Sequence, residues 1–347
     1  MREVVIVFVH LNTVFPKHLI ANIKRTNELY PEKIVCVVTN VAQELPLDLS
    51  AVLIRMDVSK YEGDLQNHQF DRGFRDGFWQ TSLIRIFVLE MVHDLYNGKA
   101  LLHVESDVLL FTGFPFETLS QIDKIMWSRF GDATDVGALI FSPEISQTHF
   151  LVSEMRRLIR EDPQLTDMSA LSRMRETHPG RIKLFPGSVS DPDFKSLPYI
   201  FDGAMLGMWL LGQDSRNNYG YTPRYKSLVE SHYQFRKGDV QIDADGNVVC
   251  HSGSQKTRLV SLHVHCKDVR LFKSDNYLIL KRVKESNRFF RFPLFSIRVF
   301  SRLFFEAITK GNIKAYIYHF PALGRILRAI RVIISRCRLG FRDWRGE

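Results

Sequence analysis

The sequence lacks two phosphate-binding signatures that many nucleotide-dependent proteins carry. Neither a GxxxxGK[ST] segment nor a GxGxxG segment occurs in its 347 residues, so P-loop and dinucleotide-binding folds have no support. Cysteine is scarce as well. The four cysteines, Cys36, Cys250, Cys266 and Cys337, are scattered without a CxxC or zinc-like spacing. This usage is typical of a reduced, cytoplasmic protein.

Long apolar runs are also absent. No uncharged apolar run reaches 18 residues, so we expect no transmembrane helix. The first apolar run, Val4–Val9, follows Met1-Arg2-Glu3 and has no small-residue cleavage site. It therefore predicts a buried strand and not a signal peptide.

Positive charge gathers at one end of the chain. The net charge is +9, but residues 268–347 hold 18 Lys/Arg against 6 Asp/Glu, whereas residues 1–267 hold 29 against 32. One face of a helix predicted in this tail carries Leu323, Ile326, Leu327, Ile330, Ile334 and Cys337, while Arg325, Arg328, Arg331 and Arg338 fall off that face. This pattern predicts a basic amphipathic helix lying on an anionic membrane, with a helix packed on the core as the alternative.

The order of apolar segments predicts an α/β domain over residues 1–275 and a separate basic helical tail over 276–347. Strands are expected at residues 4–9, 34–38, 52–56, 100–104, 108–111, 136–141 and 259–267. Helices are expected at residues 19–29, 78–96, 149–160 and 201–211, loops with short elements at 163–198, and a loop at 216–225. Such alternation is typical of a mostly parallel sheet flanked by helices.

Two acids follow one of the predicted buried strands. Glu105-Ser106-Asp107 comes directly after the apolar run 100–104. Ligands of open α/β sheets bind at the carboxyl ends of the strands, and Mg²⁺ and Mn²⁺ prefer hard oxygen ligands. The segment therefore predicts a metal and phosphate site, although a solvated turn would have the same sequence.

A second polar group ends the last predicted strand. His263, His265 and Lys267 alternate, so a strand would place all three on one face. Imidazoles can bind a metal and an ammonium can neutralise a phosphate. An exposed polar strand face is the alternative.

Four further residues are candidates. Asp202 stands near the start of a predicted helix, where it is either a general base or a partner of the helix dipole. Arg85 lies in the helix 78–96 and could pair with a phosphate, with Glu105 or Asp107, or in an ordinary ion pair. His10 and Asn12 follow the first strand, where a nucleotide base would lie.

Several of these segments together resemble GT-A fold glycosyltransferases. Residues 101–111 (LLHVESDVLLF) resemble the DxD-motif strand of that fold, and the helix with Arg85 resembles the helix before it. Further similar segments are residues 136–141, residues 201–207 with 214–217, and the LHxHxK ending at 262–267, as in bacterial surface-polysaccharide glycosyltransferases. The resemblance covers residues 1–275 and departs from the commonest pattern in having Glu at position 105.

This resemblance implies a nucleoside-diphosphate-sugar donor, with Mn²⁺ or Mg²⁺ between its diphosphate and the acids. Asp107 would bind the metal directly and Glu105 would contact the ribose or a metal-bound water. His263 or His265 would be a further metal or phosphate ligand, and Lys267 would contact phosphate. The acceptor would be a glycan or a lipid-linked glycan, reached from the cytoplasmic face of the membrane through the basic tail.

Two rival functions follow from the same features. A sugar-nucleotidyltransferase would share the sheet and the metal, but its glycine-rich N-terminal loop has no counterpart because residues 10–17 contain no glycine. A non-enzymatic RNA-binding protein could use the basic tail. The acidic body and the lack of an RNP-like motif disfavour that function, and we expect no nucleic-acid partner.

Overall fold

The computed structural model describes residues 2–69, 77–130, 134–211, 240–252, 254–273, 276 and 279, which all belong to one compact unit, Met1–Arg288. The predicted loop at 216–225 lies outside the described residues. So does the basic tail from 276 onward, apart from Asn276 and Ile279. The tail helix and the domain boundary therefore stay predictions. Within the described part, none of the helices has the length and apolarity needed to span a membrane.

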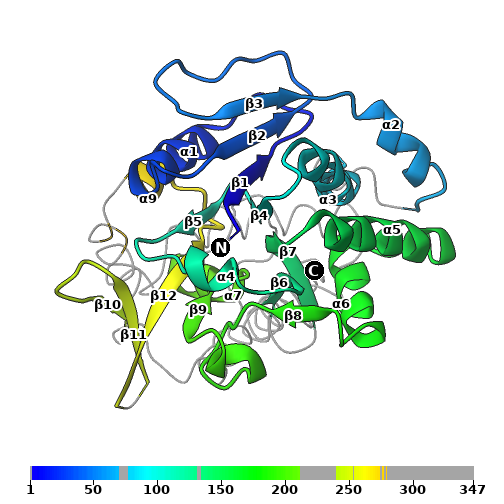
Figure 1. Ribbon diagram of the computed structural model, residues 1–347. Helices are drawn as coiled ribbons and strands as arrows, with labels where there is room; N and C mark the ends of the chain where they lie inside the picture. The colour runs from blue at the N-terminus through cyan, green and yellow to red at the C-terminus, as the bar shows by residue number, and fades with distance from the viewer. Residues whose placement is uncertain are drawn as a thin grey trace, which may run out of the picture. The chain divides into compact units, whose positions relative to one another are not determined.

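A seven-stranded sheet with the order β3-β2-β1-β4-β7-β6-β8 forms the centre of this unit (Figure 1). Four strands run parallel: β1 (Val4–Val9), β2 (Val35–Thr39), β3 (Val52–Arg55) and β4 (Ala100–Val104). The others are β7 (Thr134–Ser142), antiparallel to β4, β6 (Ile125–Phe130), antiparallel to β7, and β8 (Ile182–Leu184), parallel to β6. The predicted α/β class with a mostly parallel sheet is confirmed.

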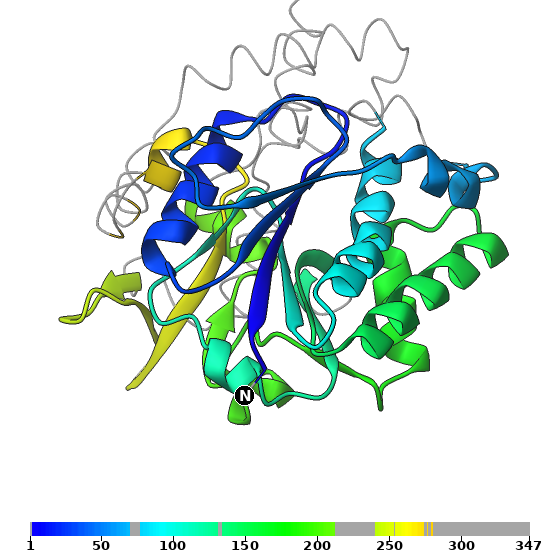
Figure 2. The same ribbon diagram turned by 45° about the horizontal axis from the view of Figure 1, so that its top comes forward.

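Helices cover both faces of this sheet (Figures 1 and 2). The larger helices are α1 (Lys17–Leu29), α3 (Phe78–Leu95), α5 (Ile145–Glu161) and α6 (Asp167–Thr177). In β1, the alternate residues Val4, Ile6 and Phe8 pack with α1, while the intervening valines pack with α3, α5 and α6. This two-sided burial explains why β1 has no polar residue. Shorter elements are α2 (Ser59–Glu62), η1 (Gly63–Leu65), α4 (Phe116–Leu119) and η2 (Pro192–Lys195).

A second sheet, with the order β10-β11-β12-β5, lies toward the lower left of Figure 1. Its strands are β5 (Val108–Leu110), β10 (Val240–Ile242), β11 (Val248–Ser252) and β12 (Gln255–His263), and β9 (Tyr199–Phe201) pairs in parallel with β12. Helices α7 (Met205–Leu211) and α9 (Val269–Lys273) pack on this sheet. Because β4 belongs to the first sheet and β5 to the second, the three residues between them connect the two sheets.

Three sequence-based expectations were wrong in detail. Residues 163–198 contain helix α6. Thr166 is the N-cap of this helix, and its side chain accepts a hydrogen bond from the Ser169 amide at 3.2 Å. Residues 201–211 are not one helix, since strand β9 ends at Phe201 and α7 begins at Met205. Strand β12 ends at His263 and does not continue to 267, because its partner β5 begins at Val108.

Candidate functional site

The turn Glu105-Ser106-Asp107 lies where the chain passes from β4 to β5. The Glu105 amide donates to the Ala138 carbonyl of β7 at 3.0 Å, and the Val108 amide donates back to the Glu105 carbonyl at 3.0 Å. Both acidic side chains are buried. The turn is thus held at the carboxyl end of a central strand, where α/β sheets bind ligands.

Helix α1 holds this turn from the other side through Asn22. The Asn22 side-chain amide donates to the carbonyls of Ser106 at 3.2 Å and Val108 at 2.8 Å, on either side of Asp107. Asn22 is buried, so these bonds have no competition from water. The sequence analysis did not select Asn22, because an asparagine within a helix carries no local signal for a contact 84 residues away.

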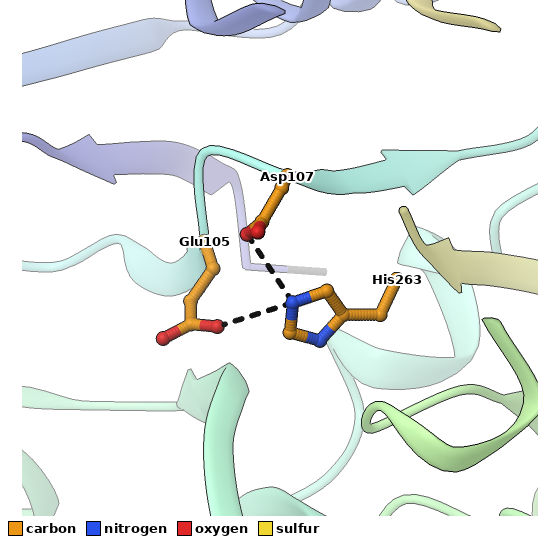
Figure 3. Close-up of side chains that lie close together, drawn as sticks. All are labelled: Glu105, Asp107 and His263. Atoms are coloured by element: carbon orange, nitrogen blue, oxygen red, sulfur yellow. Dashed lines mark ion pairs between the residues drawn. The ribbon is translucent and has the colours of Figure 1, made fainter. Parts of the chain in front are cut away.

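Strand β12 brings His263 to the two acids. His263 pairs with Val108 of β5, and the Val264 amide donates to the Asp107 carbonyl at 2.7 Å. The His263 imidazole consequently points at both carboxylates (Figure 3), with Nε2 at 3.2 Å from Asp107 Oδ1 and 3.7 Å from Glu105 Oε2. The structure therefore brings these three predicted site residues together.

A hydrogen bond on the side of the ring away from the acids fixes the orientation of His263. Its Nδ1 lies 2.8 Å from the Gly203 carbonyl oxygen, and because a carbonyl can only accept, Nδ1 carries a proton. Nε2 is therefore the nitrogen that faces the acids. Burial disfavours the imidazolium, but the charges of Asp107 and Glu105 outweigh burial and raise the pKa of His263 to about 9.

Two cations complete the cluster. Arg85 Nη2 lies 2.7 Å from Glu105 Oε1, and Lys267 Nζ lies 3.3 Å from Asp107 Oδ2. Burial alone would raise the pKa of Asp107, yet the charges of His263 and Lys267 hold it well below its usual range. Asp107 is therefore an ionised acceptor in a site from which water is largely excluded.

This arrangement fits a divalent cation. One ligand atom each from Glu105, Asp107 and His263 lies within 4.8 Å of the others. Two carboxylates and an imidazole whose Nε2 points toward them suit Mn²⁺ or Mg²⁺, provided that Nε2 gives up its proton when the metal binds. The hydrogen bond from Nδ1 to the Gly203 carbonyl is the kind of support that keeps a metal-binding histidine in place.

His265 and Lys267 reach the site by a different route from the predicted strand face. Both follow the end of β12, in a turn where Lys267 has a φ of 51°. The His265 ring stacks on His263, with centroids 4.0 Å apart and an interplanar angle of 12°. His265 is outside the group of three candidate ligands among the described residues, so His263 is the histidine that the geometry brings to the acids.

Asp202 forms a helix cap. Its Oδ1 accepts from the amides of Ala204 and Leu206, both at 3.0 Å. Its Oδ2 accepts from Gly207 at 2.7 Å and from His263 at 3.0 Å. Burial raises the pKa of Asp202 despite these four donors. Its role as general base stays a prediction, since it could take a proton from an acceptor only after giving up backbone bonds.

His10 and Asn12 lie in the loop after β1. The Asn12 side chain and that of Asn40, after β2, hydrogen-bond at 2.8 Å, and Asn12 Nδ2 donates to Thr81 of α3 at 3.2 Å. Burial lowers the pKa of His10, and the charges of Arg85 and Lys267 lower it further. The loop is thus bonded to α3, the helix that carries Arg85, and base binding by these two residues stays a prediction.

The sequence analysis also missed Asp167, the first residue of α6. Its side chain is buried, and burial raises its pKa to about 6. The charge of Arg85 opposes this rise, and the charge of Glu105 adds to it. The sequence does contain a signal for helix α6, which begins at Asp167. Thr166 is a good N-cap, and Met168, Leu171 and Met174 have helical spacing.

No protein-family model matches this chain, and no curated protein matches it. Solved structures similar to it include the galactosyltransferase LgtC, in complex with donor and acceptor sugar analogues. That match covers 85% of this chain and 99% of LgtC at 10% identity, with a TM-score of 0.41. The apo form of the glycosyltransferase GlyE of Streptococcus pneumoniae matches 53% of this chain and 45% of that chain at 11% identity, with a TM-score of 0.36. Likenesses at this level assign no activity or ligand to the chain.

Proposed function

We propose that this chain is a metal-dependent glycosyltransferase that moves a sugar from a nucleoside-diphosphate sugar to a glycan or lipid-linked glycan. The observation that carries the proposal is the buried cluster of Glu105, Asp107 and His263 at the carboxyl end of β4. Its acids stand in the segment that resembles the DxD-motif strand of GT-A fold glycosyltransferases, and its histidine stands in the segment that resembles their LHxHxK ending.

The residues at the site divide into three roles. Asp107, His263 and Glu105 would hold Mn²⁺ or Mg²⁺, which when bound supplies positive charge to the departing diphosphate. Lys267 lies 3.3 Å from Asp107 and would bind a diphosphate oxygen. Arg85 lies 2.7 Å from Glu105 and would keep that carboxylate in place. A buried site strengthens each of these contacts, since water screens them little.

The acceptor and the location belong to the same proposal. The predicted basic amphipathic tail would dock the enzyme on the cytoplasmic face of the membrane, where lipid-linked acceptors of surface-polysaccharide synthesis occur. Anionic lipid attracts each Lys or Arg near its surface with about 1 kcal/mol. The enzyme would therefore be a peripheral membrane protein.

The direct test is release of the nucleoside diphosphate from a panel of UDP-, GDP-, CDP- and dTDP-sugars, with and without Mn²⁺. We expect release from one nucleotide class, dependent on the metal, and a loss of at least about a hundredfold in Asp107→Asn. Asp123→Asn, a substitution of an acid outside the cluster, is the matched control and should keep wild-type turnover. Formation of a nucleotide sugar from a nucleoside triphosphate would instead support the nucleotidyltransferase. RNA binding without any nucleotide-sugar turnover would contradict the proposal.

A further inference from the structure

We propose that His265 is a positioning residue, whose ring holds the imidazole of His263 in the plane that the metal requires. The inference rests on the proposed function and deepens it, because it gives the second histidine of the LHxHxK segment a task beside the metal ligand. The sequence analysis treats both histidines as possible ligands. Only His263 belongs to the group of three candidate ligands in the described part of the chain.

A tight turn brings the two histidine rings together. Side chains two residues apart in an extended strand are separated by roughly 6.6 Å, at a rise of about 3.3 Å per residue. The ring centroids of His263 and His265 are only 4.0 Å apart. Strand β12 ends at His263, and in the turn after it the His265 amide donates to the His263 carbonyl at 3.1 Å. The Lys267 amide donates to the Val264 carbonyl at 2.9 Å. The turn therefore folds His265 back over His263.

The stack restrains a motion that the hydrogen bonds of His263 leave open. The His263 amide donates to Asp202 Oδ2 at 3.0 Å, and its Nδ1 lies 2.8 Å from the Gly203 carbonyl oxygen. The second contact sets the direction in which Nε2 points, but the ring can still tilt about the line from Nδ1 to this oxygen. A parallel ring against one face opposes that tilt, and stacked aromatic pairs are favourable beyond the area that they bury.

The same geometry is unsuited to two histidine ligands on one ion. The lone pair of an imidazole nitrogen lies in the plane of its ring. The planes of His263 and His265 are within 12° of parallel, so an ion in the plane of the first ring lies well outside the plane of the second. His265 would therefore act on the metal through His263.

The test measures Mn²⁺ affinity by calorimetric titration in three variants of His265. His265→Phe keeps a flat ring without a nitrogen, His265→Leu keeps bulk without a ring, and His265→Ala keeps neither. We expect His265→Phe to bind Mn²⁺ within about twofold of the wild type. The alanine and leucine variants should bind it about tenfold more weakly, as is typical when a group that supports a metal ligand is lost.

The electron paramagnetic resonance spectrum of the bound Mn²⁺ is a second readout. It reports the ligands of the ion, so His265→Phe should give the wild-type spectrum. His265 is half-buried, and we therefore expect the slightly larger phenyl ring to fit. Melting temperatures show whether each variant folds, and His265→Leu decides the matter if His265→Ala does not fold.

A matched substitution removes another histidine ring outside the cluster. The ring of His178, after α6, makes an edge-on contact with Phe150 of α5, with centroids 5.1 Å apart and an interplanar angle of 89°. His178→Ala should keep the wild-type Mn²⁺ affinity, because neither ring lies at the metal site.

Two results would overturn the inference while the proposed function stands. An equal loss of Mn²⁺ affinity in His265→Phe and His265→Ala would show that the imidazole nitrogen itself is needed. Wild-type affinity in His265→Ala or His265→Leu would show that the stacked ring does not hold His263. If the wild type binds no Mn²⁺, alone or with UDP, GDP, CDP or dTDP, the proposed function itself fails and the inference fails with it.

Discussion

Gly207, in the first turn of α7, offers a sharp test of how the site is held together. A Cβ atom at this position would lie 1.7 Å from the backbone oxygen of His263 and 2.9 Å from Asp202 Oδ2. Ordinary contacts begin at 3.4 Å, so the substitution Gly207→Ala requires α7 and the end of β12 to separate by about 1.7 Å, which is 3.4 minus 1.7. The atom in the way is backbone and cannot rotate aside.

The expected cost follows from two contributions. Overpacking of a well-packed region costs about 1–3 kcal/mol. Loss of the 2.7 Å hydrogen bond from the Gly207 amide to the Asp202 carboxylate adds about 1.5–3 kcal/mol. We therefore expect the free energy of unfolding to fall by about 2.5–6 kcal/mol, which lowers the melting temperature by roughly 5–12 °C at about 2 °C per kcal/mol.

The displacement should also weaken metal binding, because His263 would leave its place opposite Asp107 and metal–ligand distances tolerate changes of only about 0.2 Å. Thermal unfolding and calorimetric titration with Mn²⁺ measure the two effects. Gly63→Ala is the control: its φ is −58° and nothing lies within 4 Å of the added atom. Equal melting temperatures and Mn²⁺ affinities for the two variants would refute the reasoning.

Two further predictions concern residues away from the acids. Asn22→Ala leaves the carbonyl of Ser106 and the buried carbonyl of Val108 without this donor. We expect a loss of about 2 kcal/mol in stability and weaker Mn²⁺ binding, and wild-type Mn²⁺ affinity in this variant would contradict the positioning role. Burial lowers the pKa of His68 from 6.5 to about 4. Its neutral form therefore contributes stability above pH 6.5 that is lost as the pH falls through 4, at most about 3 kcal/mol. Urea unfolding should show that the free energy of unfolding depends less on pH in His68→Gln than in the wild type across this range. The same pH dependence in both proteins would exclude this contribution of His68.

The parts of the fold that could be predicted are those with strong local patterns. The run Val4–Val9 is apolar because both of its faces are covered, and α3 spans nearly the expected residues before Gly98, whose φ is 87°. The acid turn could also be found locally, since acids directly after a buried strand are unusual.

The rest of the site depends on tertiary pairing. Alternation along the chain treats His263 and His265 alike, and only the pairing of β12 with β5 selects the first for the acids. Asp202 looks like a candidate base in the sequence, but the four amides around its carboxylate come from Ala204, from α7 and from β12. Asn22 contributes through contacts that no local pattern encodes.

The central claim is that Glu105, Asp107 and His263 form a divalent-metal site that binds a nucleoside diphosphate. The most direct measurement is the melting temperature with UDP, GDP, CDP or dTDP, each with and without Mn²⁺, for the wild type and Asp107→Asn. A ligand at a hundredfold excess over its Kd stabilises the folded state by about 2.7 kcal/mol. We predict such a shift for one nucleotide, dependent on Mn²⁺ and absent in the variant. A folded wild-type protein that shows no shift with any nucleotide, or the same shift in Asp107→Asn, would contradict the claim.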